Sequence, residues 1–148
     1  MTVSSAYSRD SLRQTYSAAW HKRIAGLPLS ALEALITDVI ALHPEYQALI
    51  NDPARAVEFE AGTDGTRENP FMHMGLHMAV REQIAIDRPA GVRDLHHSLC
   101  ANFGDVHPAD HVLMQALGET LWEAQRSGQP PDETQYLARA RAAQRLGI

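Results

Sequence analysis

The chain contains few cysteine, lysine and aromatic residues. Cys100 is the only cysteine among 148 residues, so an intrachain disulfide and a thiolate metal cluster are both excluded. Lys22 is the only lysine, and the other basic residues are arginines. The formal net charge is −5 and no basic stripe is present to meet phosphates, so we expect no nucleic-acid partner. No apolar run approaches membrane-spanning length and the first residues lack a signal-peptide pattern. We therefore expect a cytoplasmic protein without a membrane segment.

Hydrophobic residues recur with helical spacing almost throughout, and no segment alternates with period two. Caps, prolines and glycines predict helix boundaries, including capping-box spacings at Ser11–Gln14 and Ser30–Glu33. The expected helices run from about Ser8 or Ser11 to Ala25, from Ser30 to His43, over 44–50, from Pro70 to about Asp87, over 92–103, from His107 as cap to Arg126, and from Asp132 to Leu146. We predict an all-α protein, one helical bundle of about six helices forming a single domain over 1–148.

Histidine is the residue in excess, with eight in the chain. The segment NPFMHMGLH places His73 and His77 four residues apart on a helix that Asn69 and Pro70 are suited to begin. The two imidazoles therefore lie one turn apart on the same face, and Val80 continues that face toward the core. Two stacked imidazoles that face inward can serve as metal ligands in a helical bundle.

Chain direction brings further histidines toward this pair. Helices joined by short connections tend to run antiparallel, so the ends that carry His43, His73 with His77, and His107 with His111 fall at one pole of the predicted bundle. His96 is expected away from that pole. We predict a divalent transition-metal site, zinc or iron, whose ligands are drawn from five histidines: His43, His73, His77 and His111, with His107 as the fifth candidate. Structural histidines that cap helices or bond within the core are the alternative.

Carboxylates are not placed as they are in the best-known metal bundles. The chain contains no Glu-x-x-His pair of the ferritin-like di-iron type and no His-Glu-x-x-His. Glu119 and Glu123 are expected to pair with arginines on neighbouring helices. An oxygen ligand or general base could come from Glu45, Glu58 or Glu60.

Four segments, AWHKRIAGLPLSALEALI, HPEYQALI, NPFMHMGLHMAVREQIAIDRPAG and LGETLWEAQRSGQPPDETQYL, resemble a proteobacterial domain-of-unknown-function family, number 1841. The resemblance covers nearly the whole chain and implies a short, cytosolic, all-helical protein, but it supplies no activity. The family pattern more often has histidine at position 47 and glutamate at 115, where this chain has Gln47 and Gln115. If the family binds two metals, this chain has lost part of one site; if the site is mononuclear, the two changes matter less.

Looser resemblances set the candidate functions. The histidine arrangement is similar to DinB-type metal bundles, and less so to hemerythrin-like bundles. They imply a metal-dependent hydrolase or transferase, or an oxygen or redox sensor. A non-enzymatic interaction protein with structural histidines is the alternative. The sequence is compatible with a small-molecule or a protein partner and with a homo-oligomer.

Overall fold

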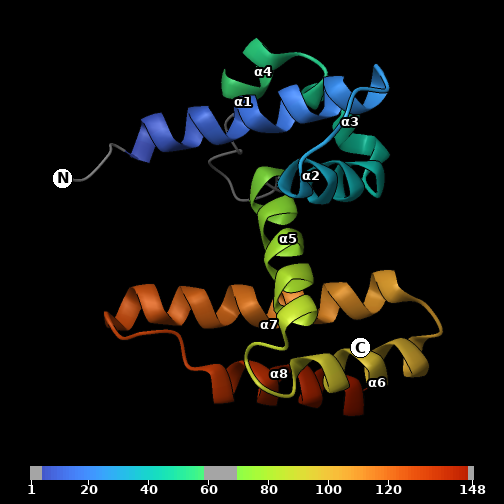
Figure 1. Cartoon of the computed structure of the whole chain (residues 1–148). Helices are drawn as coiled ribbons and strands as arrows, with labels where there is room; N and C mark the ends of the chain where they lie inside the picture. Colours follow the sequence, from blue (N-terminus) through green and yellow to red (C-terminus); the bar gives the residue numbers. More distant parts are fainter. Residues whose placement is uncertain (1–4, 59–69, 147–148) are drawn as a thin grey trace. The chain divides into compact units, whose positions relative to one another are not determined.

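The computed structural model describes residues 5–58 and 70–146. Within these ranges the chain forms α-helices and no strand, which confirms the all-α prediction (Figure 1). The helices are α1 (Ser5–Ile24), α2 (Ala31–Ala41), α3 (Pro44–Ile50), α4 (Pro53–Glu58), α5 (Pro70–Ile86), α6 (Val92–Phe103), α7 (Val106–Ser127) and α8 (Glu133–Leu146). No helix in the described ranges combines the length and the apolar content needed to cross a membrane.

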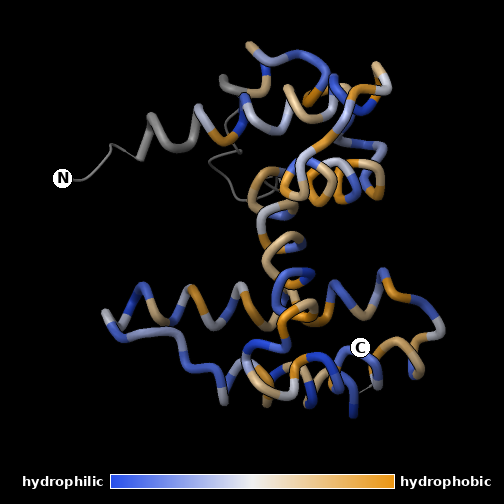
Figure 2. The backbone as a smooth tube through the Cα atoms, in the orientation of Figure 1, coloured by the Kyte–Doolittle hydropathy of each residue, from blue (hydrophilic) through white to orange (hydrophobic). Residues whose placement is uncertain are grey.

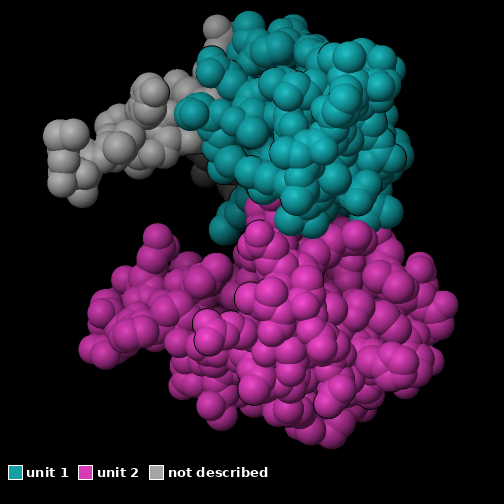
Figure 3. All heavy atoms as spheres, viewed as in Figure 1, with its two compact units in different colours: residues 1–74 teal, residues 75–148 magenta. Residues whose placement is uncertain are grey.

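The chain divides into two compact units, residues 1–74 and 75–148 (Figure 3). The division falls within α5, between Met74 and Gly75. The single domain over 1–148 stays a prediction. Along the helices of both units, hydrophobic residues recur every few positions, with polar residues between them (Figure 2). This is the pattern of helices that bury one face.

The first unit packs α1 against α2, α3 and α4. The Tyr16 ring stacks on Phe71, with 5.9 Å between ring centroids, and the Arg13 guanidinium lies 4.3 Å from the centre of the same Phe71 ring. Its buried apolar residues are Tyr16, Ala19, Trp20, Ile36, Val39, Ile40, Ile50, Ala56, Phe71 and Met74. Helix α1 thus supplies one wall of this core and α2 another.

Local signals predicted most, but not all, boundaries of the first unit. The capping box of α2 is present, because Ser30 accepts from the Glu33 backbone N–H and the Glu33 side chain accepts from the Ser30 backbone N–H. The predicted start of α1 at Ser8 or Ser11 is wrong, since α1 begins at Ser5 and the Ser11 carbonyl accepts a bond from Thr15 within the helix. Helix α4 was not predicted; Asp52 accepts from the Arg55 backbone N–H at its start.

The second unit packs α7 against both α6 and α8, and α6 against α8. Its core consists of Val80, Val92, Leu95, Leu99, Ala109, Leu113, Met114, Ala116, Leu117, Tyr136, Leu137 and Ala140. Gly104, with φ of 73°, ends α6 in the left-handed conformation that glycine adopts readily. Only two residues, Gly104 and Asp105, separate α6 from α7.

The start of α7 corrects one prediction. Asp105 is the cap, and its side chain accepts a bond from the His107 backbone N–H, so His107 lies inside the helix. Aspartate three residues before Pro108 provides the oxygen acceptor that an N-cap requires. The predicted cap Asp132 of α8 is confirmed by a 3.0 Å bond from the Gln135 backbone N–H. The predicted cap Asn69 lies outside the described residues.

Candidate metal-binding histidines

Helix α5 carries two of the candidate ligands on one face. His73 and His77 are separated by one helical turn, as predicted, and the helix is continuous from Pro70 to Ile86. His77 is fully buried and His73 is half-buried. His73 lies beside one histidine from the α2–α3 connection, and His77 lies beside two histidines from α7.

In the first unit, His73 lies beside His43. Their ring centroids are 4.7 Å apart and the ring planes are nearly perpendicular, at 80°. His43 follows α2, where Pro44 starts the next helix, and its side chain is buried as its place on the apolar stripe predicted. Tyr46, one turn into α3, stacks on His43 at 5.2 Å and meets the edge of His73 at 5.9 Å.

One hydrogen bond sets the tautomer of His43. Its Nδ1 lies 2.8 Å from the backbone carbonyl oxygen of Val39. A carbonyl oxygen only accepts, so Nδ1 donates and carries the proton. In the neutral ring the lone pair is then on Nε2, which is the form of histidine that binds metals.

In the second unit, His77 lies beside His107 and His111 of α7. The His77 ring centroid is 6.0 Å from each of the other two, and the His107 and His111 centroids are 4.3 Å apart. His107 and His111 are separated by one turn of α7, so they share a face of that helix. Both are half-buried.

A buried carboxylate orients His77. Asp110 is 1% exposed, and its Oδ2 accepts a bond of 2.7 Å from Nε2 of His77. Its Oδ1 accepts a second bond of 2.7 Å from Nε2 of His96, and Nη2 of Arg81 lies 3.4 Å from Oδ2. Burial alone would raise the pKa of Asp110, but the hydrogen bonds from His77 and His96 and the charge of Arg81 outweigh it and hold that pKa well below its usual range.

This carboxylate determines the tautomer of neutral His77 as well. An ionised carboxylate only accepts, so His77 donates from Nε2 and its neutral ring has the lone pair on Nδ1. A histidine that donates to a carboxylate through one nitrogen and binds a metal through the other is a common arrangement in metalloproteins. The nitrogen through which His77 could bind a metal is therefore Nδ1.

Sequence reasoning missed Asp110, Arg81 and the role of His96. His96 was expected far from the other histidines, yet it shares Asp110 with His77. One signal was available: Asp110 lies three and four residues before the buried Leu113 and Met114, so it continues their apolar face. A carboxylate at such a position requires partners.

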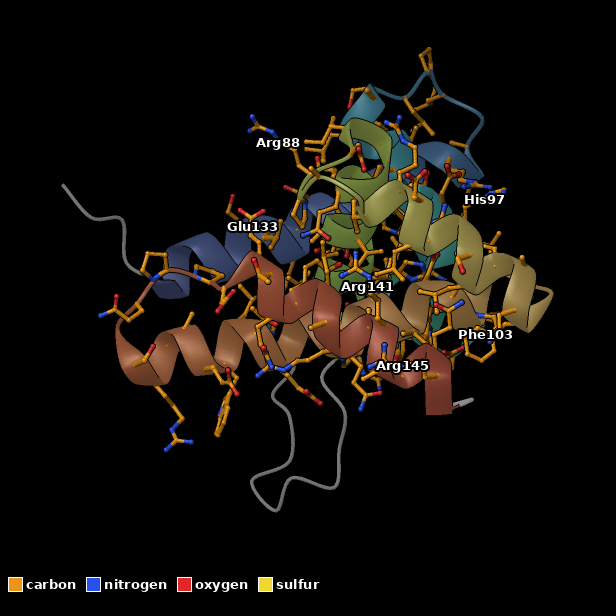
Figure 4. The ribbon with its side chains drawn as sticks, turned by 90° about the horizontal axis from the view of Figure 1, so that it is seen from below. Arg88, His97, Phe103, Glu133, Arg141 and Arg145 are labelled. Atoms are coloured by element: carbon orange, nitrogen blue, oxygen red, sulfur yellow. The ribbon has the colours of Figure 1, made fainter. Side chains whose placement is uncertain are left out.

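The remaining predictions concern the glutamates and two further histidines. Glu119 and Glu123 pair with Arg139 of α8, as predicted, at 3.5 and 2.5 Å. Glu45 is exposed at the start of α3, and the side chains of Glu58 and Glu60 lie outside the described residues. Of the two remaining histidines, His21 is exposed with Nε2 3.1 Å from the Asn51 carbonyl oxygen, and His97 is exposed on α6 (Figure 4).

Cys100 does not have the properties of a nucleophile. Its thiol lies 3.7 Å from Nε2 of His96. Burial raises the pKa of this thiol, and the negative charges of Asp110 and Asp105 raise it further. The thiol is therefore protonated near neutral pH, whereas thiolate is the reactive form.

Together these features define a protein that is all-α over its described residues, in which one helix presents two histidines, each with an imidazole neighbour from another segment of its unit. The chain belongs to the family described as Domain of unknown function (DUF1841), whose model matches residues 8–142. The comparison with curated proteins and the comparison with solved structures found no match.

Proposed function

We propose that the protein binds one divalent transition-metal ion, zinc or iron, through His43, His73, His77 and His111. The observation that carries the proposal is the pairing of both α5 histidines: His73 with His43, and His77 with His111. Each of the four residues offers a ring nitrogen as a ligand. Imidazole is a good ligand for both metals.

The spacing on α5 supports a shared ion. Side chains four residues apart on a helix are about 5–6 Å apart at Cβ, which lets two imidazoles reach one metal ion. The hydrogen bonds that His43 and His77 donate favour different ring nitrogens as ligands, Nε2 in His43 and Nδ1 in His77. His107 is the candidate for a fifth ligand, since its ring lies 4.3 Å from that of His111.

The metal defines which reactions to assay. An ion that retains one bound water acts as a Lewis acid or supplies hydroxide, so hydrolysis and group transfer are the first classes. Iron bound by the same ligands would permit oxygen or redox sensing, and bound iron would be detected by its visible absorption. The polar groups that surround the ligands in the second unit, Asp110, His96 and Arg81, orient His77 and balance charge.

A structural role for the histidines is the second candidate. It is favoured by the bonds from His43 to the Val39 carbonyl and from His77 to Asp110, which are bonds that buried core histidines make. In this case the histidines stabilise helix contacts and no ion is needed. A non-catalytic interaction protein would fit this arrangement.

Metal analysis of protein purified without a histidine tag tests the first proposal. We expect about one equivalent of zinc or iron per chain, and loss of most of it in His43→Ala and in His77→Ala, with His97→Ala as the exposed control. Retention of metal in His43→Ala would contradict a site that needs the first unit. Less than about a tenth of an equivalent, together with no thermal stabilisation of wild-type protein by added zinc or iron, would reject metal binding.

The structural alternative makes a different prediction for the same proteins. If the histidines only stabilise the fold, chelator changes neither the melting temperature of wild-type protein nor the size of the destabilisation in His73→Ala. If they bind metal, chelator lowers the wild-type melting temperature and removes most of the difference between wild type and His73→Ala.

A further inference from the structure

The second unit contains a cavity of about 580 Å³ between α6, α7 and α8. This volume is in the range of pockets that bind small molecules. Its walls are mostly apolar and include Phe103, Pro108, Val112, Ala116, Ala142 and Ala143. Phe103, at the end of α6, lies next to the C-terminal part of α8 (Figure 4). The two alanines of α8 create much of the space, because larger side chains at these positions would project into it.

One end of the cavity is formed by imidazoles. His107 and His111 both line it, and their ring centroids are 4.3 Å apart. Gln115, one turn after His111, lines the same side with an uncharged amide. These groups can donate and accept hydrogen bonds, so they suit a polar atom of a ligand.

Among the described residues that line the cavity, the only guanidinium is already neutralised. Arg139 contacts Glu119 and Glu123 at 3.5 and 2.5 Å, and its Nη1 donates a 2.9 Å bond to Oγ1 of Thr120. With two carboxylates against one guanidinium, this group offers no net positive charge to an anionic ligand. A cationic ligand would lose its hydration against the apolar walls. The cavity is therefore suited to an uncharged molecule.

We propose that this cavity binds a small uncharged molecule with an apolar body and one hydroxyl or carbonyl group. The polar group lies at the His107–His111 end, and the apolar body lies between Phe103 and the alanines of α8. Because His111 is also a proposed metal ligand, this proposal rests on the proposed function and names the substrate class of the proposed metal site. The binding of the apolar body does not require the metal.

A set of probes with the same six-carbon chain tests the choice of ligand. Hexan-1-ol, hexanoate and hexylammonium are titrated into chelator-treated protein and followed by two-dimensional NMR of the labelled chain. We expect saturable shifts at the cavity residues for hexan-1-ol, and at least tenfold weaker binding for the two charged probes. Equal binding of all three, or no binding of hexan-1-ol, would overturn the proposal.

Variants that fill the cavity test whether hexan-1-ol binds there. Ala143→Phe is expected to weaken hexan-1-ol binding at least tenfold, and Ala138→Phe, at an exposed position of the same helix, is the matched control. Gln115→Trp obstructs the cavity from α7 at an exposed position, so it serves if Ala143→Phe fails to fold. Unchanged affinity in a folded cavity variant would overturn the proposal.

Failure of the metal site and failure of the cavity give different results. His43→Ala lies in the first unit and is expected to lose metal while retaining hexan-1-ol binding. Ala143→Phe is expected to lose hexan-1-ol binding while retaining metal. Loss of hexan-1-ol binding in His43→Ala would contradict a cavity that is formed by the second unit alone.

Discussion

His77 and Asp110 form a buried pair in which Nε2 of the imidazole lies 2.7 Å from Oδ2 of the carboxylate, with the two side chains 0% and 1% exposed. The pair joins α5 to α7 within the second unit. His96 of α6 and Arg81 of α5 complete the set of donors to the same carboxylate. A single aspartate therefore connects three helices and also orients a proposed metal ligand.

Asp110→Asn tests this connection. The amide keeps the shape of the side chain but presents an N–H₂ group to one of the two histidine donors and removes the charge that balances Arg81. We expect a loss of about 3 kcal/mol in the free energy of unfolding, measured by urea denaturation at neutral pH. Metal affinity is expected to fall by about 10–100-fold. Asp94→Asn, at an exposed position of α6, is the control, and an equal effect in both variants would contradict the prediction.

Glu33 gives the protein a pH dependence at the start of α2. The bond from Lys22, 2.8 Å away, and the Ser30 backbone N–H lower the pKa of Glu33 to about 2. Its carboxylate therefore stabilises the folded state fully above the unfolded-state pKa of about 4.3, and that contribution is lost as the pH falls toward 2. Glu33→Gln should flatten the decline in unfolding free energy between about pH 5 and 2, and Lys22→Met should flatten it partly. A decline as steep as wild type in Glu33→Gln would refute the assignment.

Tyr136 and Gln83 link α8 to α5 in the second unit. The buried phenol donates a 2.7 Å bond to Oε1 of Gln83, and burial raises the pKa of Tyr136, so the hydroxyl stays protonated. Tyr136→Phe is expected to cost about 1 kcal/mol of unfolding free energy. In a double-mutant cycle with Gln83→Leu, the coupling energy should equal most of the loss in unfolding free energy seen in Tyr136→Phe. Additive effects of the two substitutions would show that the bond contributes nothing.

Two glycines are expected to respond oppositely to alanine. A Cβ atom would meet no atom within 4 Å at Gly104 or Gly75, so packing affects neither substitution. Gly104 has φ of 73°, and Gly104→Ala should cost about 1 kcal/mol of unfolding free energy. Gly75 lies within α5, and Gly75→Ala should add about 0.5–1 kcal/mol. Thermal melts of both variants check the signs, and a shift in the same direction would contradict this account.

Helix boundaries were predictable wherever a short local motif determines them. The Ser30–Glu33 box, Pro44, Gly104 and Asp132 act within a few residues of the helix end that they fix, so the sequence contains the whole signal. Ser11–Gln14 has the same spacing as a capping box but lies inside α1, because further helical turns precede it. A cap motif therefore indicates a possible start and does not require one.

The candidate site was predictable in its histidines and not in its carboxylate. Helical spacing identified His73 with His77, and the apolar stripe of α2 identified His43, because both are local properties of the chain. The partners of Asp110 are 14, 29 and 33 residues away in sequence, and the pairing follows from how α5, α6 and α7 pack. His107 was misassigned as a cap because Pro108 follows it, although Asp105 supplies the better acceptor.

The two-residue turn between α6 and α7 imposes a constraint on chain length. Helices joined by so short a loop adopt one of a few characteristic arrangements, so one inserted residue in this turn would change the direction and rotation of α7 relative to α6. The turn would then no longer hold Asp110 opposite His96, and it would displace Phe103 relative to His107 and His111 in the wall of the cavity. Related chains can vary the residues of this turn within the demands of its conformation, but a change in its length would require compensation elsewhere. The turn is therefore a place where insertions and deletions should be rare.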